Sequence, residues 1–121
     1  MKAAMNTRDH NDKKDDMERL ARASSSHDVE AAVDALGSLA RIAIVGYLRR
    51  HGPATRGDLA LGLAMDPGTV QVQLGHLRRR GVVVGSSIRA TGADRHRMLY
   101  AIDAARTREL LAALAAELLG E

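Results

Sequence analysis

The chain has no cysteine, phenylalanine or tryptophan, and two tyrosines are its only aromatic residues. Without cysteine it has no disulfide bond, no thiolate metal ligand and no cysteine nucleophile. No apolar run reaches the roughly 20 residues that a membrane-spanning helix needs, and the first residues lack the apolar stretch of a signal peptide. We therefore expect a cytoplasmic protein that has no membrane partner.

Because large aromatic side chains are scarce, the core has to be built from leucine, valine, isoleucine, alanine and methionine. A chain of 121 residues corresponds to one domain, and small side chains bury little apolar area each. Association with a second copy would bury more apolar surface. We therefore expect a homodimer.

The N-terminal residues 1–27 differ in composition from the rest of the chain. They hold six basic and five acidic residues, three consecutive serines and few aliphatic residues. This predicts a flexible charged arm at 1–27 and one folded domain at 28–121. The arm fits a solvated tail, and it also fits a segment that contacts DNA or wraps around a dimer partner.

Helix and strand signals in the folded part give a mainly α-helical order with one β-hairpin, α-α-α-α-β-β-α. Helices are predicted to follow Asp28, Ser38, Thr55, Asp66 and Asp103. In the helix after Thr55, the inward candidates are Leu59, Leu61 and Leu63. The last helix runs from Ala104 to about Leu119. The hairpin is predicted from a strand that begins with the β-branched Val82, Val83 and Val84, a turn signal after it, and a return strand at Met98 to Ile102.

The helix predicted over 67–80 has an unusual outer face. At about 100° per residue, Val70, Leu74 and Leu77 share one face and point to the core. The opposite face and its flanks comprise Gly68, Thr69, Gln71, Val72, Gly75, His76 and Arg79, and no acidic residue lies between Pro67 and Arg80. Such a face fits close approach to a polyanion. A glutamine can pair with N6 and N7 of adenine, and a valine or threonine methyl can touch a thymine methyl. Alternatively, Gly75 allows another helix to cross closely.

Charge is distributed unevenly along the chain, whose net charge is +3. Residues 41–102 contain ten arginines and three aspartates, whereas the helical segments on either side of them are net acidic. This asymmetry is typical of a nucleic-acid-binding face that is separate from an assembly face. The five histidines are scattered and form no catalytic or metal-binding pattern, so we expect neither an enzyme nor a cofactor.

Three segments together resemble the ArsR-type winged helix-turn-helix repressors, whose core the MarR-type regulators share. They are ALGSLARIAIVGYLRRHGPATRGDLALGL (35–63), MDPGTVQVQLGHLRRRGVV (65–83) and MLYAI (98–102). The resemblance implies a winged helix-turn-helix fold and a dimeric, sequence-specific DNA-binding transcriptional regulator that acts as a repressor. The recognition helix 67–80 would enter the major groove, and the wing 87–97 would touch the adjacent backbone or minor groove.

Two departures from that family pattern matter. The Ser-Arg-His-like triplet of the family aligns with Gln71, Val72 and Gln73, so the bases preferred by this chain differ. Metal-sensing members use cysteine pairs, or histidine and acidic ligands on the last helix. The chain has no cysteine and no histidine after Asp103, so we expect no metal site. Whether a small-molecule effector exists stays open.

The partners expected from this reasoning are double-stranded DNA and a second copy of the chain. The candidate DNA contacts are Arg56, Gly68, Thr69, Gln71, Val72, Gln73, His76, Arg79, Arg89, Arg95 and Arg97. The candidate dimer contacts are Val29, Val33, Leu36, Leu111, Leu114 and Leu118, which lie at helical spacing on the first and last helices. An alternative function is a winged-helix module that binds another protein and has no specific affinity for DNA.

Overall fold

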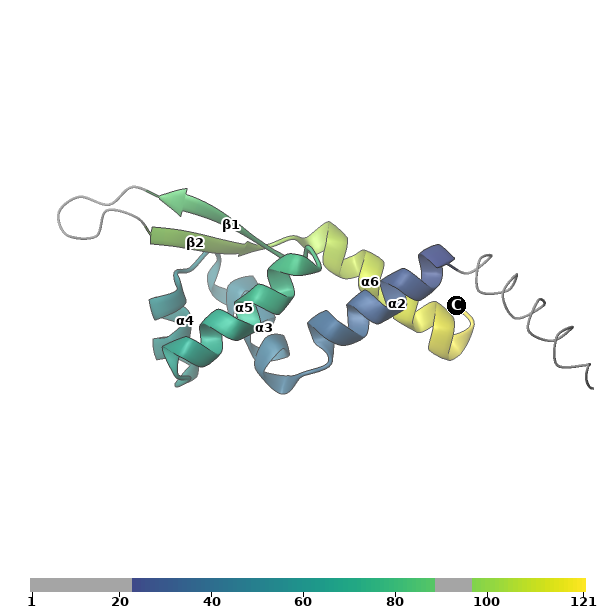
Figure 1. Ribbon diagram of the computed structural model, residues 1–121, viewed down its shortest axis with the longest axis horizontal. Helices are drawn as coiled ribbons and strands as arrows, with labels where there is room; N and C mark the ends of the chain where they lie inside the picture. The colour runs from purple at the N-terminus through teal and green to yellow at the C-terminus, as the bar shows by residue number, and fades with distance from the viewer. Residues whose placement is uncertain (1–22, 89–96) are drawn as a thin grey trace, which may run out of the picture.

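The protein was analysed in a computed structural model that describes residues 23–88 and 97–121. The element order is α2 (Ala23–Leu36), α3 (Leu39–His51), α4 (Arg56–Leu63), α5 (Pro67–Arg79), β1 (Val83–Ile88), β2 (Arg97–Ile102) and α6 (Ala104–Leu119). This order confirms the predicted fold class: α4 and α5 form the helix-turn-helix, and the β1–β2 hairpin forms the wing (Figure 1).

The helix starts follow the side-chain caps that the sequence predicts. The Thr55 hydroxyl accepts a hydrogen bond from the Asp58 backbone N–H, and the Asp58 carboxylate accepts one from the Thr55 N–H. The pKa of Asp58 is lowered, chiefly by that backbone hydrogen bond. The Asp66 carboxylate accepts from the N–H groups of Gly68 and Thr69, and Pro67 occupies the first turn. These caps satisfy backbone donors that have no partner within the helix, and they fix where α4 and α5 begin.

One boundary differs from the sequence prediction. Helix α2 begins at Ala23, ahead of the start that we predicted at Asp28. Helix propagation is favourable once a turn has formed, so a helix can extend into a segment of poor apolar periodicity. Residues 1–22, which make up most of the predicted arm, lie outside the described residues.

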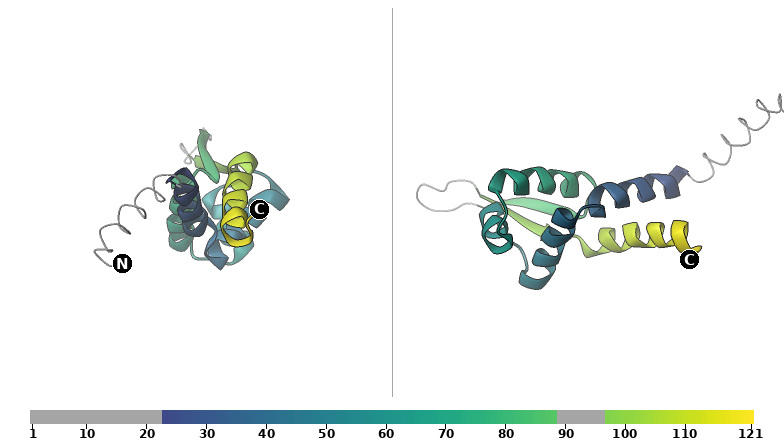
Figure 2. Two further views of the ribbon diagram at one scale, coloured as in Figure 1. Left: turned by 90° about the vertical axis from the view of Figure 1, so that its right-hand side faces the viewer. Right: turned by 90° about the horizontal axis from the view of Figure 1, so that it is seen from below.

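The molecule is elongated, and its two ends are built from different elements. At one end α3, α4 and α5 pack beneath the hairpin, and at the other α2 and α6 run side by side (Figures 1 and 2). The largest fully buried side chains are Ile44, Leu48, Leu59, Val70, Leu74, Leu77, Val82, Val83 and Leu110. The three predicted core positions of α5, Val70, Leu74 and Leu77, are thereby confirmed.

The prediction for Leu61 on α4 is wrong. Leu59 is fully buried and Leu63 packs against the core, whereas Leu61 is 87% exposed. A residue two positions further along an α-helix is rotated by about 200°, so Leu61 has to face away from the side that buries Leu59.

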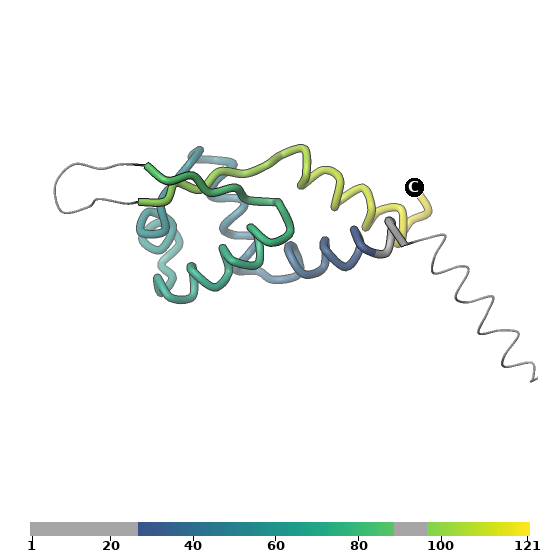
Figure 3. Tube along the Cα trace, turned by 45° about the horizontal axis from the view of Figure 1, so that its top comes forward, coloured from purple at the N-terminus to yellow at the C-terminus, as the bar shows by residue number. Residues whose placement is uncertain are grey.

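The wing is an antiparallel pair whose register runs from Val83 opposite Ile102 to Ile88 opposite Arg97. Strand β2 is also bonded to the α3–α4 connection, since Ala54 and Tyr100 exchange two backbone hydrogen bonds of 3.0 and 2.8 Å. These bonds attach β2 to the helix-turn-helix, and the chain trace in Figure 3 shows both strands running beside its helices.

Within residues 23–88 and 97–121, no single helix has both the length and the hydropathy required to span a bilayer. The segments His27–Leu36 and Leu39–His51 meet those criteria only when taken as a pair, across a bend of 84°.

Candidate nucleic-acid interface

The outer face of α5 is open to solvent over its first two turns. Gly68, Thr69, Gln71 and Val72 are exposed, and the Val72 side chain keeps 58% of its surface accessible. Among the described residues, a Cβ on Gly75 would meet only the Arg79 guanidinium within 4 Å. Gly75 therefore does not serve a close helix crossing within this chain.

The two glutamines of α5 occupy different environments. The exposed Gln71 accepts a hydrogen bond of 2.7 Å at Oε1 from Nη1 of Arg56 on α4. The half-buried Gln73 accepts one of 2.6 Å from Nη1 of Arg41 on α3, and the Nε of Arg41 is buried without a hydrogen-bond partner. Gln71 thus lies on the open face of α5, whereas Gln73 connects α5 to α3.

His76 is directed toward α2. Its Nδ1 lies 3.3 Å from Oδ1 of Asp34 and 3.0 Å from a terminal nitrogen of Arg79. The other carboxylate oxygen of Asp34 accepts a hydrogen bond of 2.9 Å from Nε of Arg80. The pKa of Asp34 is lowered, mainly by this bond from Arg80 and to a smaller extent by His76. Asp34 therefore joins α2 to the C-terminal end of α5.

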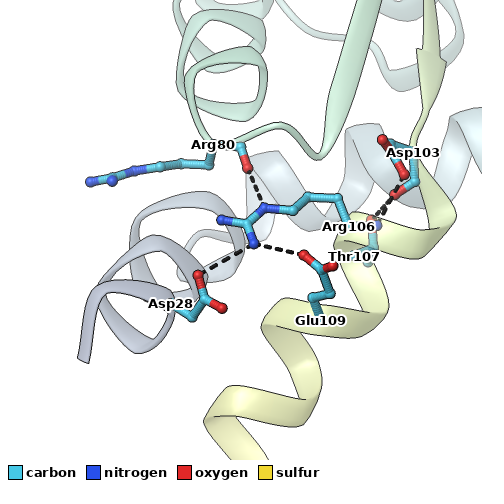
Figure 4. A network of polar contacts seen from close by, with 6 residues as sticks. All are labelled: Asp28, Arg80, Asp103, Arg106, Thr107 and Glu109. Atoms are coloured by element: carbon cyan, nitrogen blue, oxygen red, sulfur yellow. Dashed lines mark hydrogen bonds and ion pairs between the residues drawn. The ribbon is translucent and has the colours of Figure 1, made fainter. Parts of the chain in front are cut away.

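A second ionic network holds the same end of α5 (Figure 4). The Arg106 side chain donates to the Arg80 carbonyl at 3.1 Å, to Asp28 at 3.3 Å and to Glu109 at 2.8 Å. Hydrogen bonding to Glu109 is the main reason that the pKa of Arg106 is raised. Sequence reasoning missed both networks because Asp34 lies 46 positions from Arg80 and Asp28 lies 78 positions from Arg106, distances at which no local spacing signals a contact.

An open depression of about 510 Å³ lies between the start of α4, the start of α5 and strand β2. It is lined by Thr55, Arg56, Gly57, Pro67, Gln71, Arg97, Met98 and Tyr100. Three of the predicted DNA contacts, Arg56, Gln71 and Arg97, are therefore brought together from three separate elements. The predicted contacts Arg89 and Arg95 lie outside the described residues.

The predicted dimer residues divide into two groups. Val33 on α2 and Leu111 and Leu118 on α6 are exposed, and Leu118 keeps 70% of its surface accessible. Val29, Leu36 and Leu114 are half-buried, and the last two pack against the core. The end of the molecule formed by α2 and α6 thus carries apolar side chains that no described residue covers.

Within the described ranges, no group of three or more His, Asp or Glu side chains is arranged to hold a metal ion.

No protein-family model and no curated protein sequence matches the chain, but solved structures do. An ArsR family transcriptional regulator is 24% identical with a TM-score of 0.57, over 78% of this chain and 87% of that one. The antimony-specific transcriptional repressor AntR is 25% identical with a TM-score of 0.55, over 76% and 78%. A MarR family transcription regulator is 18% identical with a TM-score of 0.52, over 96% and 76%.

These similarities confirm the predicted resemblance: the chain has the winged helix-turn-helix fold of ArsR-type regulators, which MarR-type regulators share. The AntR structure is that of a transcriptional repressor, in agreement with the prediction that this chain is not an enzyme.

Proposed function

We propose that the chain is a cytoplasmic, homodimeric transcriptional repressor that binds double-stranded DNA sequence-specifically. The observation that carries the proposal is the exposed, acid-free outer face of α5, which lies beside arginines of α4 and β2. A helix with such a surface can enter the major groove without repelling phosphates. Similarity to the repressor AntR supports the regulatory role.

Within this proposal, the residues of α5 have separate tasks. Gly68, Thr69, Gln71 and Val72 face the base edges, and Arg79 pairs with phosphate. Gln73 and His76 hold α5 to its neighbours, because Oε1 of Gln73 accepts from Arg41 of α3 and Nδ1 of His76 faces Asp34 of α2.

Arginines from two further elements complete the proposed interface. Arg56 at the start of α4 and Arg97 on β2 line the depression next to Gln71. Arg97, with Arg89 and Arg95 of the wing, would approach a neighbouring phosphate chain or minor groove.

A second copy would cover the exposed apolar side chains of α2 and α6. A two-fold dimer places its recognition helices in half-sites about 34 Å apart, so the DNA site would be nearly palindromic.

Leu111→Glu tests the dimer, because it puts a charge on the apolar face of α6 and does not change α5. We expect the variant to sediment as a monomer and to lose most of its affinity for a two-half-site duplex.

A gel-shift series in increasing salt tests DNA binding itself. The logarithm of the binding constant should fall linearly with the logarithm of the salt concentration, with a slope of about 0.9 per phosphate neutralised. Arg97→Ala should make the slope shallower, whereas Glu117→Gln on the far helix should leave it unchanged. A wild-type protein that binds no duplex at about 50 mM salt would contradict the proposal.

The second candidate function is docking of a protein partner. The observation that favours it is the exposure of Leu61 on α4, an apolar side chain that no described residue covers. This alternative would be supported if the protein binds a protein partner, loses that affinity in Leu61→Ser, and binds no duplex.

The antimony specificity of AntR is not extended to this chain, which has no cysteine.

A further inference from the structure

We propose that Arg56 and Gln71 act as one hydrogen-bond-donating pair that selects guanine over adenine at the base faced by Gln71. This inference rests on the proposed DNA-binding function and specifies which base that function selects. It differs from the expectation, based on the sequence, that a glutamine at this position pairs with adenine.

The bond between these two side chains determines how the Gln71 amide is oriented. Nη1 of Arg56 lies 2.7 Å from Oε1 of Gln71. A guanidinium carries only donors, so its partner on the amide has to be the oxygen and not the nitrogen. The amide nitrogen of Gln71, with two N–H donors, is therefore the end that is left to face a ligand.

Both members of the pair are exposed and border the same open depression. They come from different helices, α4 and α5, whose starts are fixed by the caps of Thr55 and Asp66. The pair is therefore presented toward solvent on a rigid support, with its donors oriented before any ligand arrives. Preorganised donors lose less conformational freedom on binding.

The two purines differ in what they offer such a pair. In the major groove, guanine presents two acceptors, N7 and O6, whereas adenine presents the acceptor N7 and the donor N6. A free glutamine matches adenine because its oxygen accepts from N6 while its nitrogen donates to N7. Here the oxygen already accepts from a cation, and an adenine amino group would approach the donors of Arg56. Guanine meets donors from both side chains instead.

Gln73 provides a matched control within the same helix. It makes an equivalent bond from its Oε1 to Nη1 of an arginine, at 2.6 Å, but it is half-buried against α3 and lies away from the depression. Replacing Gln73 with alanine should weaken binding equally on all sequences, because a residue that only holds α5 to α3 contacts no base.

Selection of bound duplexes from a random pool, with the full chain, identifies the operator and tests the pair. In the wild type, the base pair whose preference is lost in Gln71→Ala should contain guanine. Replacing that guanine with 7-deazaguanine, which lacks the N7 acceptor, should weaken wild-type binding by about 5- to 100-fold and have little effect on Gln71→Ala. Inosine, which retains N7 and O6, should be tolerated by both.

Arg56→Ala gives the sharpest result, because it frees the oxygen of Gln71. The selected base at that one position should shift from guanine toward adenine, while the rest of the operator is unchanged. Arg49→Ala removes the same charge from an exposed position on α3 and should leave the preference unaltered. Circular dichroism and thermal melting verify that each variant is folded.

An operator that has adenine at this position in the wild type would overturn the inference alone. So would a guanine preference that survives Arg56→Ala or that Gln71→Ala does not relax. A pool in which no sequence is enriched would overturn the proposed function and the inference together.

Discussion

Replacing Asp34 with asparagine keeps the shape of the side chain and removes its charge. In the wild type, Asp34 accepts a hydrogen bond of 2.9 Å from Nε of Arg80 and lies 3.3 Å from Nδ1 of His76. These contacts join α2 to the C-terminal end of α5. Asp34→Asn should therefore destabilise the protein and loosen the attachment of α5.

The expected magnitude follows from how exposed the contact is. Hydrogen bonds to charged groups contribute about 1.5–3 kcal/mol when they are shielded, and exposed ion pairs contribute about 0.2–1 kcal/mol. The side chains of Asp34 and Arg80 are 28% and 27% exposed, so the contact is intermediate. We expect a loss of about 1 kcal/mol in the free energy of unfolding at neutral pH.

The effect should depend on pH with a defined sign. The pKa of Asp34 is lowered in the folded protein, principally by the hydrogen bond from Arg80. A carboxylate with a lowered folded pKa stabilises the protein above its unfolded pKa, about 3.9, and that stabilisation is lost as the pH falls through the folded value. The difference between wild type and Asp34→Asn should be constant near neutrality and shrink below about pH 4.

Urea denaturation of four proteins tests this reasoning: the wild type, Asp34→Asn, Arg80→Ala and the double variant. The coupling energy from the cycle should be about 0.5–1 kcal/mol. Glu117→Gln, which removes an exposed charge from α6, serves as the control and should have little effect. Additive losses in the cycle, or a difference that is equally large at pH 7 and pH 3, would refute the proposed role of Asp34.

Three further variants test the fold around the interface. Leu77→Ala empties a fully buried position on the core face of α5 and should lower the free energy of unfolding by about 2–5 kcal/mol in urea titrations; a loss below that range would mean that the site collapses. Asp66→Ala removes the cap of α5 and should cost about 0.5–2 kcal/mol, whereas Asp66→Asn should retain most of the stability. Gly62→Ala would place a Cβ against the Tyr47 ring and should cost about 1–3 kcal/mol; an unchanged melting temperature would show that the ring moves aside freely.

Local chemistry explains why most of the fold was predictable. The side chains of Thr55, Asp66 and Asp103 each accept a hydrogen bond from the backbone N–H three residues further along, so sequence spacing alone reveals these caps. The core face of α5 follows from helical periodicity for the same reason. The misassigned Leu61 was an error of periodicity, because a residue two positions after Leu59 is rotated by about 200° and cannot share its buried face.

The sequence names three residues that border the depression, Arg56, Gln71 and Arg97, but it does not give the contacts between them. Sequence reasoning placed Gln71 and Gln73 together as DNA contacts, since both lie on the polar side of the helix. Their different contacts come from Arg56 and Arg41, which reach them from two other helices. No periodicity within 67–80 encodes such partners, so the distinction emerges only from the tertiary structure.

The most direct test of the central claim is an NMR titration of the isotopically labelled full chain with the selected operator duplex. If the outer face of α5 lies in the major groove, backbone amide shifts should change most over Gly68–Gly75 and along β2, with salt-dependent amplitude. Shift changes confined to α2 and α6, with α5 unaffected at saturating duplex, would contradict the account.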